Sequence, residues 1–148
     1  MYLSVLSSRQ ISLLKKLKFL KKYKFYLAGG TALALQIRHR TSLDFDFYTK
    51  KQFNSHKLRE EFDKHFKKVE EIYLAEDTLG LDVWGIRISF FRYPYRLIRS
   101  QKELEGINLA SLEDIAAMKI ISISQRGKKR DFIDIYFLIK EFDLSKII

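Results

Sequence analysis

The sequence of 148 residues predicts a domain of the α+β class, in which a core of mixed strands and helices is followed by a C-terminal helical segment. Three observations predict it. Apolar and polar residues alternate over residues 43–48 and again over residues 79–90, which is the period of half-buried strands. Elsewhere, apolar residues recur at helical spacing. A single proline and six glycines leave little material for a flexible linker.

The first elements are expected to be a helix, a short strand and a second helix. Ser7 or Ser8 can cap the first helix, because a serine hydroxyl accepts a hydrogen bond from the first helical turn. Its apolar positions have helical spacing: Ile11, Leu14, Leu17 and Leu20. An apolar strand over residues 25–28 then ends at Gly29-Gly30, and Thr31 opens a short helix.

The middle of the chain predicts strands around one further helix. Leu43, Phe45 and Phe47 alternate with polar positions and are expected to face the core. A helix is expected over residues 52–66. Beyond it, two alternating runs flank Trp84-Gly85, which predicts a hairpin with a two-residue turn.

The rest of the chain predicts a helical tail. Pro94 is expected to end the sheet, so that residues 1–98 form the core and residues 99–148 the C-terminal helical segment. Ser111, with Asp114 three residues later, is close to a capping box and predicts a helix that runs to Gln125. Gly127 breaks this helix, and a last helix is expected over residues 130–142.

Composition excludes several classes of protein. Cysteine is absent, which excludes disulfide scaffolds, zinc–thiolate sites and cysteine nucleophiles, and mildly favours a reducing cytoplasm. No apolar run approaches the ~18 residues that a membrane helix needs, so no membrane partner is expected. Hydrophobic residues make up 47% of the chain, enough for a packed core.

The positive charge is concentrated near the N-terminus. The chain has 28 Lys and Arg against 18 Asp and Glu, a formal net charge of +10, and residues 1–50 carry +8 of it. This asymmetry indicates an anionic partner, either a nucleic acid or an acidic protein. The alternative is a solvated lysine face that serves solubility.

Asp44 and Asp46 are the sharpest candidates for chemistry. Two residues apart on a strand, they project from the same face while their apolar neighbours face the core. Paired carboxylates held in this way can share Mg²⁺, which prefers oxygen ligands. The alternative is an ordinary amphipathic strand with a solvated polar side, although aspartate is depleted in strands.

A second candidate site lies at Gly29-Gly30-Thr31. A strand that ends in two glycines and continues into a helix exposes backbone N–H groups at the helix N-terminus, which can bind phosphate. The alternative is a plain turn with a threonine cap. The order of strand, glycine pair, helix and carboxylate-bearing strand places a phosphate site beside a metal site, as nucleotidyl transfer requires.

Two stretches of the sequence resemble a known family. The segment FYLAGGTALAL at residues 25–35, followed by HRTSLDFDF at residues 39–47, is similar to the first motif of the AbiEii/AbiGii-type nucleotidyltransferase-like toxins. The tail segments SLEDIAAMK at residues 111–119 and QRGKKRDFID at residues 125–134 extend the resemblance to about residues 23–142. It implies the minimal polymerase-β-like nucleotidyltransferase fold, a mixed sheet flanked by helices with a C-terminal helical segment.

The resemblance also implies a function. Members are often toxins of toxin–antitoxin or phage-defence systems, paired with a separate antitoxin, and some transfer nucleotides from NTP to tRNA. It implies that Asp44 and Asp46 hold Mg²⁺ or Mn²⁺ and that the glycine motif meets the triphosphate. The remaining implied site residues act on phosphate or orient the groups that do: Lys119, Arg126, Asp131 and Asp134.

Helical spacing supports part of this assignment. Lys119 and Arg126 fall near one stripe of a helix, and Asp131 and Asp134 share a face of the last helix. The alternatives are a solvated Lys119 and a surface ion pair between Arg130 and Asp134. His39, with Arg38 and Arg40, could contact phosphate or lie in a solvated loop, and Tyr93 and Tyr95 could stack on a base or pack.

Ser89 departs from the pattern of polymerase-β-like enzymes. These commonly carry a third carboxylate on a later strand, and Ser89 occupies the matching place here. A hydroxyl is a poor Mg²⁺ ligand and no general base at neutral pH. Two functions therefore stay open: a metal-dependent nucleotidyltransferase toxin that acts on RNA, with tRNA expected, and a catalytically silent module that binds nucleotide, RNA or a partner protein.

Overall fold

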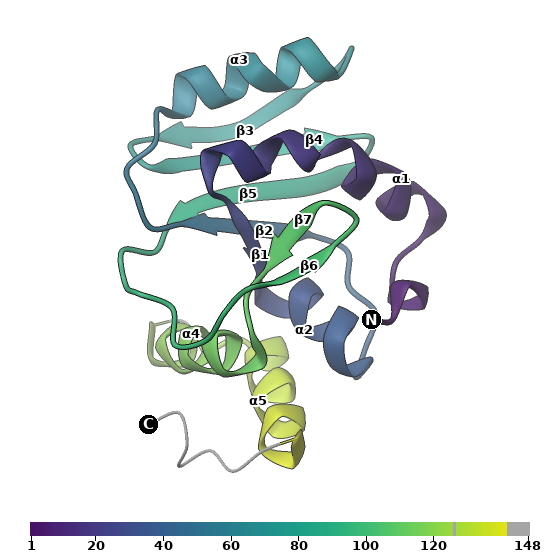
Figure 1. Cartoon of the computed structure of the whole chain (residues 1–148), viewed down its shortest axis with the longest axis vertical. Helices are drawn as coiled ribbons and strands as arrows, with labels where there is room; N and C mark the ends of the chain where they lie inside the picture. Colours follow the sequence, from purple (N-terminus) through teal and green to yellow (C-terminus); the bar gives the residue numbers. More distant parts are fainter. Residues whose placement is uncertain (126, 142–148) are drawn as a thin grey trace.

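A computed structural model describes residues 1–125 and 127–141 (Figure 1). The helices, in chain order, are η1 (Leu3–Val5), α1 (Ser8–Lys16), η2 (Lys18–Tyr23), α2 (Gly29–Ile37), α3 (Ser55–His65), α4 (Leu112–Gln125) and α5 (Lys129–Glu141), of which η1 and η2 are 3-10 helices. The strands are β1 (Tyr26–Ala28), β2 (Phe45–Thr49), β3 (Glu70–Ala75), β4 (Thr78–Val83), β5 (Ile86–Arg92), β6 (Lys102–Leu104) and β7 (Ile107–Leu109).

The seven described strands form one mixed sheet. Their order is β3-β4-β5-β2-β1-β7-β6. The pairs β2–β5 and β1–β7 are parallel, and the other neighbours are antiparallel. The expected α+β class, with a mixed sheet flanked by helices, is therefore confirmed.

One face of the sheet is covered by helices. Phe47 of β2 and Phe90 of β5 are fully buried on this face, with ring centroids 5.5 Å apart. Phe62 of α3 packs edge-on against Phe90, and Phe19 of η2 packs against Phe62. Figure 1 shows α1 in front of this face and α3 along its β3 edge. This layer holds most of the apolar core.

The other face carries the polar residues of the same strands. Because side chains alternate along a strand, Asp46 and Tyr48 of β2 point away from Phe47. Parallel pairing sets Asp46 beside Ser89 and Tyr48 beside Phe91. Helices α2, α4 and α5 lie together at one end of the molecule, below the sheet in Figure 1. The candidate site lies between these helices and the polar face.

Local sequence signals account for several of these elements. Ser7 caps α1, and a capping box joins it to Gln10. Trp84 and Gly85, with φ of 58° and 80°, form the expected two-residue turn between β4 and β5. Ser111 accepts a hydrogen bond from the backbone N–H of Asp114, at the start of α4.

The expectation that Pro94 ends the sheet is wrong. Residues 102–109 form the β6–β7 hairpin, and β7 pairs with β1 in parallel, so that Leu27 lies beside Leu109. Each strand has only three residues, which is too short for an alternation to show in the sequence. The division of the chain at residue 98 stays a prediction.

The expectation that Leu43 faces the core is also wrong. Its side chain is 77% exposed, because β2 begins only at Phe45. The backbone carbonyls of Ser42 and Leu43 instead accept hydrogen bonds from the Gln10 side chain. The segment before β2 is thus held by α1. The last helix ends at Glu141 within the described residues, and the expected end at residue 142 lies outside them.

Candidate active site

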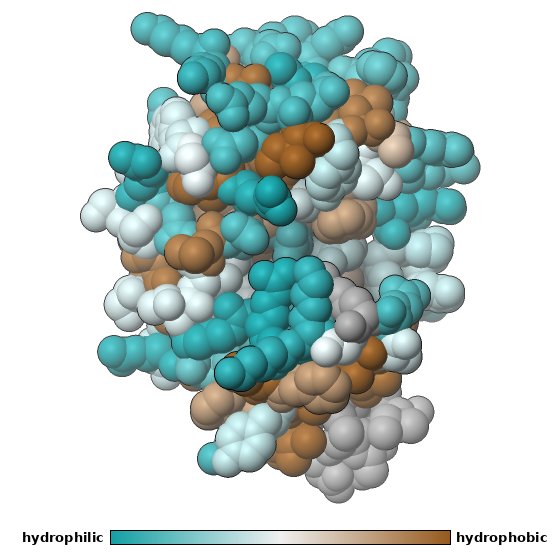
Figure 2. Space-filling model, turned by 180° about the vertical axis from the view of Figure 1, so that it is seen from behind, coloured by the Kyte–Doolittle hydropathy of each residue, from teal (hydrophilic) through white to brown (hydrophobic). Residues whose placement is uncertain are grey.

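A cavity of about 920 Å³ opens beside the polar face of the sheet. Its walls come from the start of α2, the segment over residues 40–46, strand β5 with the segment that follows it, and α4. The view from behind, in Figure 2, shows hydrophilic side chains gathered across the middle of the face opposite to α1. A cavity of this volume lies at the upper end of the range for ligand sites.

Asp44 and Asp46 line this cavity together. Asp44 directly precedes β2, and Asp46 lies on it, with the buried Phe45 between them. Both carboxylates are partly exposed. Ser89 lies beside Asp46 on the neighbouring strand and is 4% exposed. The two carboxylates border one cavity, although Asp44 lies before the strand and not on it as expected, and Ser89 is the neighbour of Asp46.

Gly29 allows the chain to turn from β1 into α2 against Asp46. Its φ is +69°, a conformation that favours glycine, and a Cβ atom at this position would lie 3.0 Å from Oδ2 of Asp46. The N-cap residue of α2 is Ala28, and no side chain caps the helix. The first N–H groups of a helix lack intrahelical partners, so the start of α2 offers them to the cavity.

Thr31 holds the carboxylate segment against α2. The residue is 2% exposed, and its hydroxyl contacts the Ser42 hydroxyl and donates a hydrogen bond to the backbone carbonyl of Asp44. Its side chain therefore fixes the place of Asp44. Its backbone N–H, in the first turn of α2, is the group that stays oriented for an anion.

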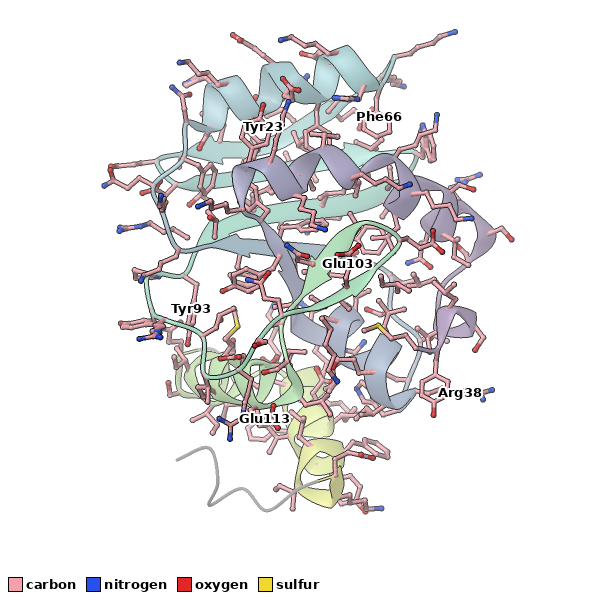
Figure 3. The ribbon with its side chains drawn as sticks, in the orientation of Figure 1. Tyr23, Arg38, Phe66, Tyr93, Glu103 and Glu113 are labelled. Carbon is pink, nitrogen blue, oxygen red and sulfur yellow. The ribbon has the colours of Figure 1, made fainter. Side chains whose placement is uncertain are left out.

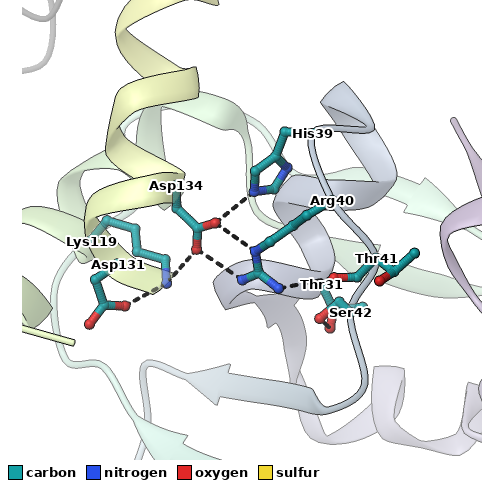
Figure 4. Close-up of polar contacts among 8 residues, drawn as sticks. All are labelled: Thr31, His39, Arg40, Thr41, Ser42, Lys119, Asp131 and Asp134. Atoms are coloured by element: carbon teal, nitrogen blue, oxygen red, sulfur yellow. Dashed lines mark hydrogen bonds and ion pairs between the residues drawn. The ribbon is translucent and has the colours of Figure 1, made fainter. Parts of the chain in front are cut away.

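The tail contributes a buried cluster of charges (Figure 4). Lys119 Nζ of α4 lies 2.9 Å from Oδ1 of Asp131 and 2.8 Å from Oδ2 of Asp134, both on α5. Asp134 Oδ1 also accepts hydrogen bonds from His39 Nε2 at 2.6 Å and from Arg40 Nε at 2.9 Å. The side chains of both aspartates are fully buried. This cluster ties the loop after α2 to α4 and α5.

The partners of Asp134 determine its ionisation. Burial alone would raise its pKa, but the hydrogen bonds from His39, Arg40 and Lys119, with the charge of Lys119, outweigh that effect. The pKa of this carboxyl therefore lies well below its ordinary value. Asp134 stays ionised wherever the protein is folded near neutral pH.

The structure decides between several alternatives left open by the sequence. Lys119 is not a solvated lysine, since its side chain is only 6% exposed. Asp134 is fully buried against Lys119, His39 and Arg40 and is not a surface partner of the exposed Arg130. The side chain of His39 is not solvated, since it is 1% exposed and contacts Asp134.

The placement of the remaining predicted residues is mixed. The cavity is bordered together by Gly30, Thr31, Lys119, Asp44 and Asp46, as expected. Asp131 and Asp134 share a face of α5 and orient Lys119. Arg126 lies outside the described residues. The chemical roles assigned to these residues stay predictions.

Sequence reasoning named Arg40, Tyr93 and Tyr95 as possible ligand contacts but missed most of the other basic lining. Arg40, Arg87, Arg92, Lys128 and Arg130 line the cavity in addition to Lys119, against two acidic residues, Asp44 and Asp46, among the described lining. Arg87 could have been found, because it alternates with Ser89 on the polar side of a predicted strand. The excess of cations suits a polyanionic ligand such as a triphosphate.

Tyrosines form another part of the wall. Tyr48, Tyr93 and Tyr95 line the cavity, and the rings of Tyr93 and Tyr95 meet edge-on with centroids 5.2 Å apart. Figure 3 shows Tyr93 in the segment that leaves β5, on the same side of the molecule as α4. Tyr95 is 63% exposed. An exposed ring at the cavity mouth is available for stacking on a base.

The N-terminal lysines lie elsewhere. Lys15, Lys18 and Lys22 are exposed on α1 and η2, and none of them lines the cavity. Lys22 pairs with Glu61 at 3.3 Å, and the stem of Lys18 lies against Gly106. These lysines belong to the layer on the other side of the sheet from Asp46.

The sequence of this chain matches a family model described as "Nucleotidyl transferase AbiEii toxin, Type IV TA system" over residues 12–148. The chain belongs to the AbiEii family. A relative, the uncharacterized protein aq_aa25 of Aquifex aeolicus (strain VF5), is 43% identical over 129 residues. That alignment covers 83% of this chain and 62% of the relative, so the chain spans less than two thirds of that protein's length.

Solved structures share the AbiEii fold at low sequence identity. JHP933 from Helicobacter pylori has a TM-score of 0.63 and 19% identity, over 97% of this chain and 70% of that one. The Megavirus polyadenylate synthase has a TM-score of 0.62 and 17% identity, over 88% of this chain and 31% of that one. These similarities show the nucleotidyltransferase fold. None of the described helices is long and apolar enough to cross a membrane.

Proposed function

We propose that this chain is a toxin that transfers a nucleotide from an NTP to RNA, with tRNA as the expected acceptor, and that it uses Mg²⁺ or Mn²⁺. The observation that carries the proposal is the shared cavity wall of Asp44, Asp46 and the start of α2. Two carboxylates and an uncapped helix N-terminus are groups that bind a metal and a triphosphate side by side. Membership of the AbiEii family supports the same reaction.

The donor set suits a hard divalent cation. Asp44 and Asp46 would hold the ion, since carboxylate oxygens are its preferred protein ligands and substrate phosphates complete its coordination. The described residues contain no cluster of three or more His, Cys, Asp or Glu that could bind a metal without substrate. When bound, such an ion neutralises developing charge on the transferring phosphate.

The residues of the chain divide the remaining work. The N–H groups at the start of α2 bind the phosphates, while the cavity's arginines and lysines balance their charge. The attacking hydroxyl forms a bond to the α-phosphorus, and the bond to pyrophosphate breaks. Among the described lining residues, Asp44 and Asp46 are the only carboxylates, so one of them accepts the hydroxyl proton.

Other observations support the RNA acceptor and the antitoxin partner. The exposed Tyr95 and the net charge of +10 favour a nucleic acid with accessible bases. The Megavirus relative by fold is named as a polyadenylate synthase. The type IV toxin–antitoxin description of the family supports a cognate antitoxin. Action inside the cytoplasm follows from an RNA target.

A direct test uses each labelled nucleoside triphosphate in turn, with Mg²⁺, total RNA and the full chain. We expect label to enter RNA with one or more of the four nucleotides and to be absent when the metal is chelated. Purified tRNA compared with tRNA-depleted RNA then identifies the acceptor. Absence of label with all four nucleotides and either metal would overturn the enzymatic proposal.

One observation favours a second function. Ser89 lies beside Asp46 where a third carboxylate could strengthen the metal site, and it is buried. A site with two carboxylates can bind nucleotide without fast turnover, so a catalytically silent module that binds nucleotide, RNA or a partner protein is the alternative. A chain that binds a nucleotide, but transfers no label to RNA in the assay above, would support it.

A further inference from the structure

The side chain of Arg40 is held in a fixed position in the cavity wall. Its Nε lies 2.9 Å from Oδ1 of Asp134 and its Nη2 lies 3.1 Å from Oδ2, which is a bidentate pair. Its Nη1 donates to the backbone carbonyl of Thr41 at 3.2 Å. A guanidinium has five N–H donors, so two remain for a ligand. The side chain is 24% exposed and lines the cavity.

Gly30 brings this guanidinium onto the start of α2. A Cβ atom at Gly30 would lie 2.0 Å from Nη2 of Arg40, so any larger residue would displace the arginine. Gly30 has no positive φ, and the close approach of Arg40 is therefore what requires a glycine here. The guanidinium and the first-turn N–H groups of α2 meet at one point of the cavity wall.

Lys119 is in the opposite situation. Its ammonium is 6% exposed and lies between Asp131 and Asp134 at 2.9 and 2.8 Å. Moving it to a phosphate would take its positive charge away from two fully buried carboxylates, which is costly. Its charge is therefore committed to the protein, although part of the residue borders the cavity.

We propose that Arg40 binds the phosphates of the nucleotide and that Asp134 is the positioning residue that holds it there, with Lys119 bracing Asp134. This inference rests on the proposed function and names the phosphate-binding side chain of that site. Figure 4 shows the chain of contacts from Lys119 through Asp134 to Arg40, whose guanidinium also bonds to Thr41. His39 is a third donor residue to Asp134, beside Arg40 and Lys119, and helps to fix the orientation of its carboxylate.

The test measures binding of inorganic tripolyphosphate, a probe that needs no knowledge of the base, and of the four NTPs. The full chain is titrated by calorimetry, and thermal melts confirm that each variant is folded. We expect Arg40→Gln to weaken tripolyphosphate binding about tenfold or more and Arg40→Lys to weaken it less, because lysine keeps the charge and loses the bidentate pair. Lys119→Gln should change the Kd of its folded fraction less than Arg40→Gln does.

Arg38→Gln is the matched control. Arg38 lies two residues away, is exposed, and is not part of the cavity lining. Figure 3 shows it at the outer edge of the molecule, at the end of α2. We expect its tripolyphosphate Kd to equal that of the wild type.

Two further variants test the positioning without removing Arg40. Gly30→Ala should weaken binding in the wild type and have little added effect together with Arg40→Gln, because both changes remove the same interaction. Asp134→Asn should behave in the same way, and Asp134→Glu should restore part of the affinity. Additive effects in both double-mutant cycles would overturn the positioning role.

The outcomes separate this inference from the proposed function. A wild type that binds neither tripolyphosphate nor any NTP contradicts the proposed function itself. A wild type that binds, with an Arg40→Gln variant within twofold of it, leaves the proposed function intact and overturns the role of Arg40. A larger loss in Lys119→Gln than in Arg40→Gln assigns the phosphate to the lysine and also overturns it.

Discussion

The two faces of strands β2 and β5 are built from alternating residues of the same sequence and do different work. On one face, Phe47 and Phe90 are fully buried under the helices α1, η2 and α3. On the other, Asp46 and Ser89 border a cavity. The core face gives the strands a fixed register, and that register sets the spacing of the polar groups. The stability of one face thus determines the geometry of the other.

The charges of the two sides differ as well. The helical side carries the exposed lysines of the first 50 residues, some of them in surface ion pairs such as Lys21 with Glu103 at 2.7 Å. The cavity side uses mainly arginines, with the two carboxylates between them. Arginine has a rigid set of donors that suits phosphate, whereas an exposed lysine acts as a mobile point charge. Variants on each side should therefore give separable effects.

The largest effect is expected for the cavity carboxylates. Asp44→Asn and Asp46→Asn should each abolish nucleotide transfer and growth inhibition. Loss of a metal ligand removes several kcal/mol of transition-state stabilisation, because the charge of the phosphate is no longer compensated. Transfer of label to RNA and growth of expressing cells are the measurements. Asp63→Asn, on the surface of α3, is the control and should keep full activity. Unchanged toxicity in both cavity variants would favour the silent binding module.

Adjacent residues of β5 should differ in their effect on stability. Phe90→Ala removes a fully buried ring and should lower the free energy of unfolding by about 3–5 kcal/mol. Phe91→Ala, on the cavity face and only partly buried, should cost clearly less. Urea unfolding of both variants measures the difference. Equal losses would mean that the cavity face contributes as much to the core as the helical face.

Acid should weaken the cavity side through Asp134. Because the pKa of this carboxyl is depressed in the folded protein, its stabilisation is fully present above its ordinary value of 3.8 and is lost as the pH falls below that value. Asp134→Asn should lower the free energy of unfolding at neutral pH by about 3–5 kcal/mol, the cost of a broken buried pair. Below pH 3.8, the free energy of unfolding of this variant should fall less steeply with falling pH than that of the wild type. Urea unfolding along a pH series tests it. A variant with the same acid slope as the wild type would contradict this role.

A third carboxylate should make stability depend on metal. Ser89→Asp places a negative charge on the strand beside Asp46. Two negative charges at such a short distance repel each other unless a cation lies between them. The variant should melt at a lower temperature in chelator and recover in excess Mg²⁺ through binding linkage. Each kcal/mol corresponds to a shift of about 2–4 °C at this size. A Mg²⁺ shift no larger than that of the wild type would place Ser89 away from the metal.

The smallest effect on the cavity is expected from the far side. Replacing Lys15, Lys18 and Lys22 together with glutamine should leave tripolyphosphate binding unchanged, because none of them lines the cavity. If RNA also binds to this side, its log–log salt slope should fall by close to one unit for each RNA phosphate that the variant no longer neutralises. RNA binding measured across a salt series decides between an RNA-binding role and solubility. A weakened tripolyphosphate affinity would contradict the separation of the two sides.

The sequence predicted those parts of the molecule that depend on local periodicity. Alternation placed Phe45 and Phe47 in the core, and the i, i+3 spacing placed Asp131 and Asp134 on one face. The family resemblance, and not the alternation, set Ser89 at the place of a third carboxylate, and strand pairing puts it beside Asp46. Strand and helix periods are properties of a few consecutive residues, so a single sequence contains them.

Interactions between distant polar residues could not be predicted in this way. Arg40 and Asp134 are 94 positions apart, and nothing in the local pattern of either indicates the other. The β6–β7 hairpin was not predicted, because its strands are too short to show an alternation of apolar and polar residues. Leu43 is exposed because β2 begins only at Phe45, and the Gln10 side chain, 33 positions away, bonds to the Leu43 carbonyl, a contact that no local alternation indicates.

The dependence of Arg40 on Asp134 has a consequence for the time at which the site forms during translation. The ribosome synthesises β1, α2 and β2 well before α4 and α5. A nascent chain that has reached only β5 therefore carries both cavity carboxylates and Arg40 without α4 or α5. In such a chain Arg40 has no carboxylate partner from α5, because Asp134 is still to be added. The pair of Arg40 and Asp134, proposed to bind phosphate, therefore assembles only when nearly the whole described chain has left the ribosome. Incomplete translation products lack it.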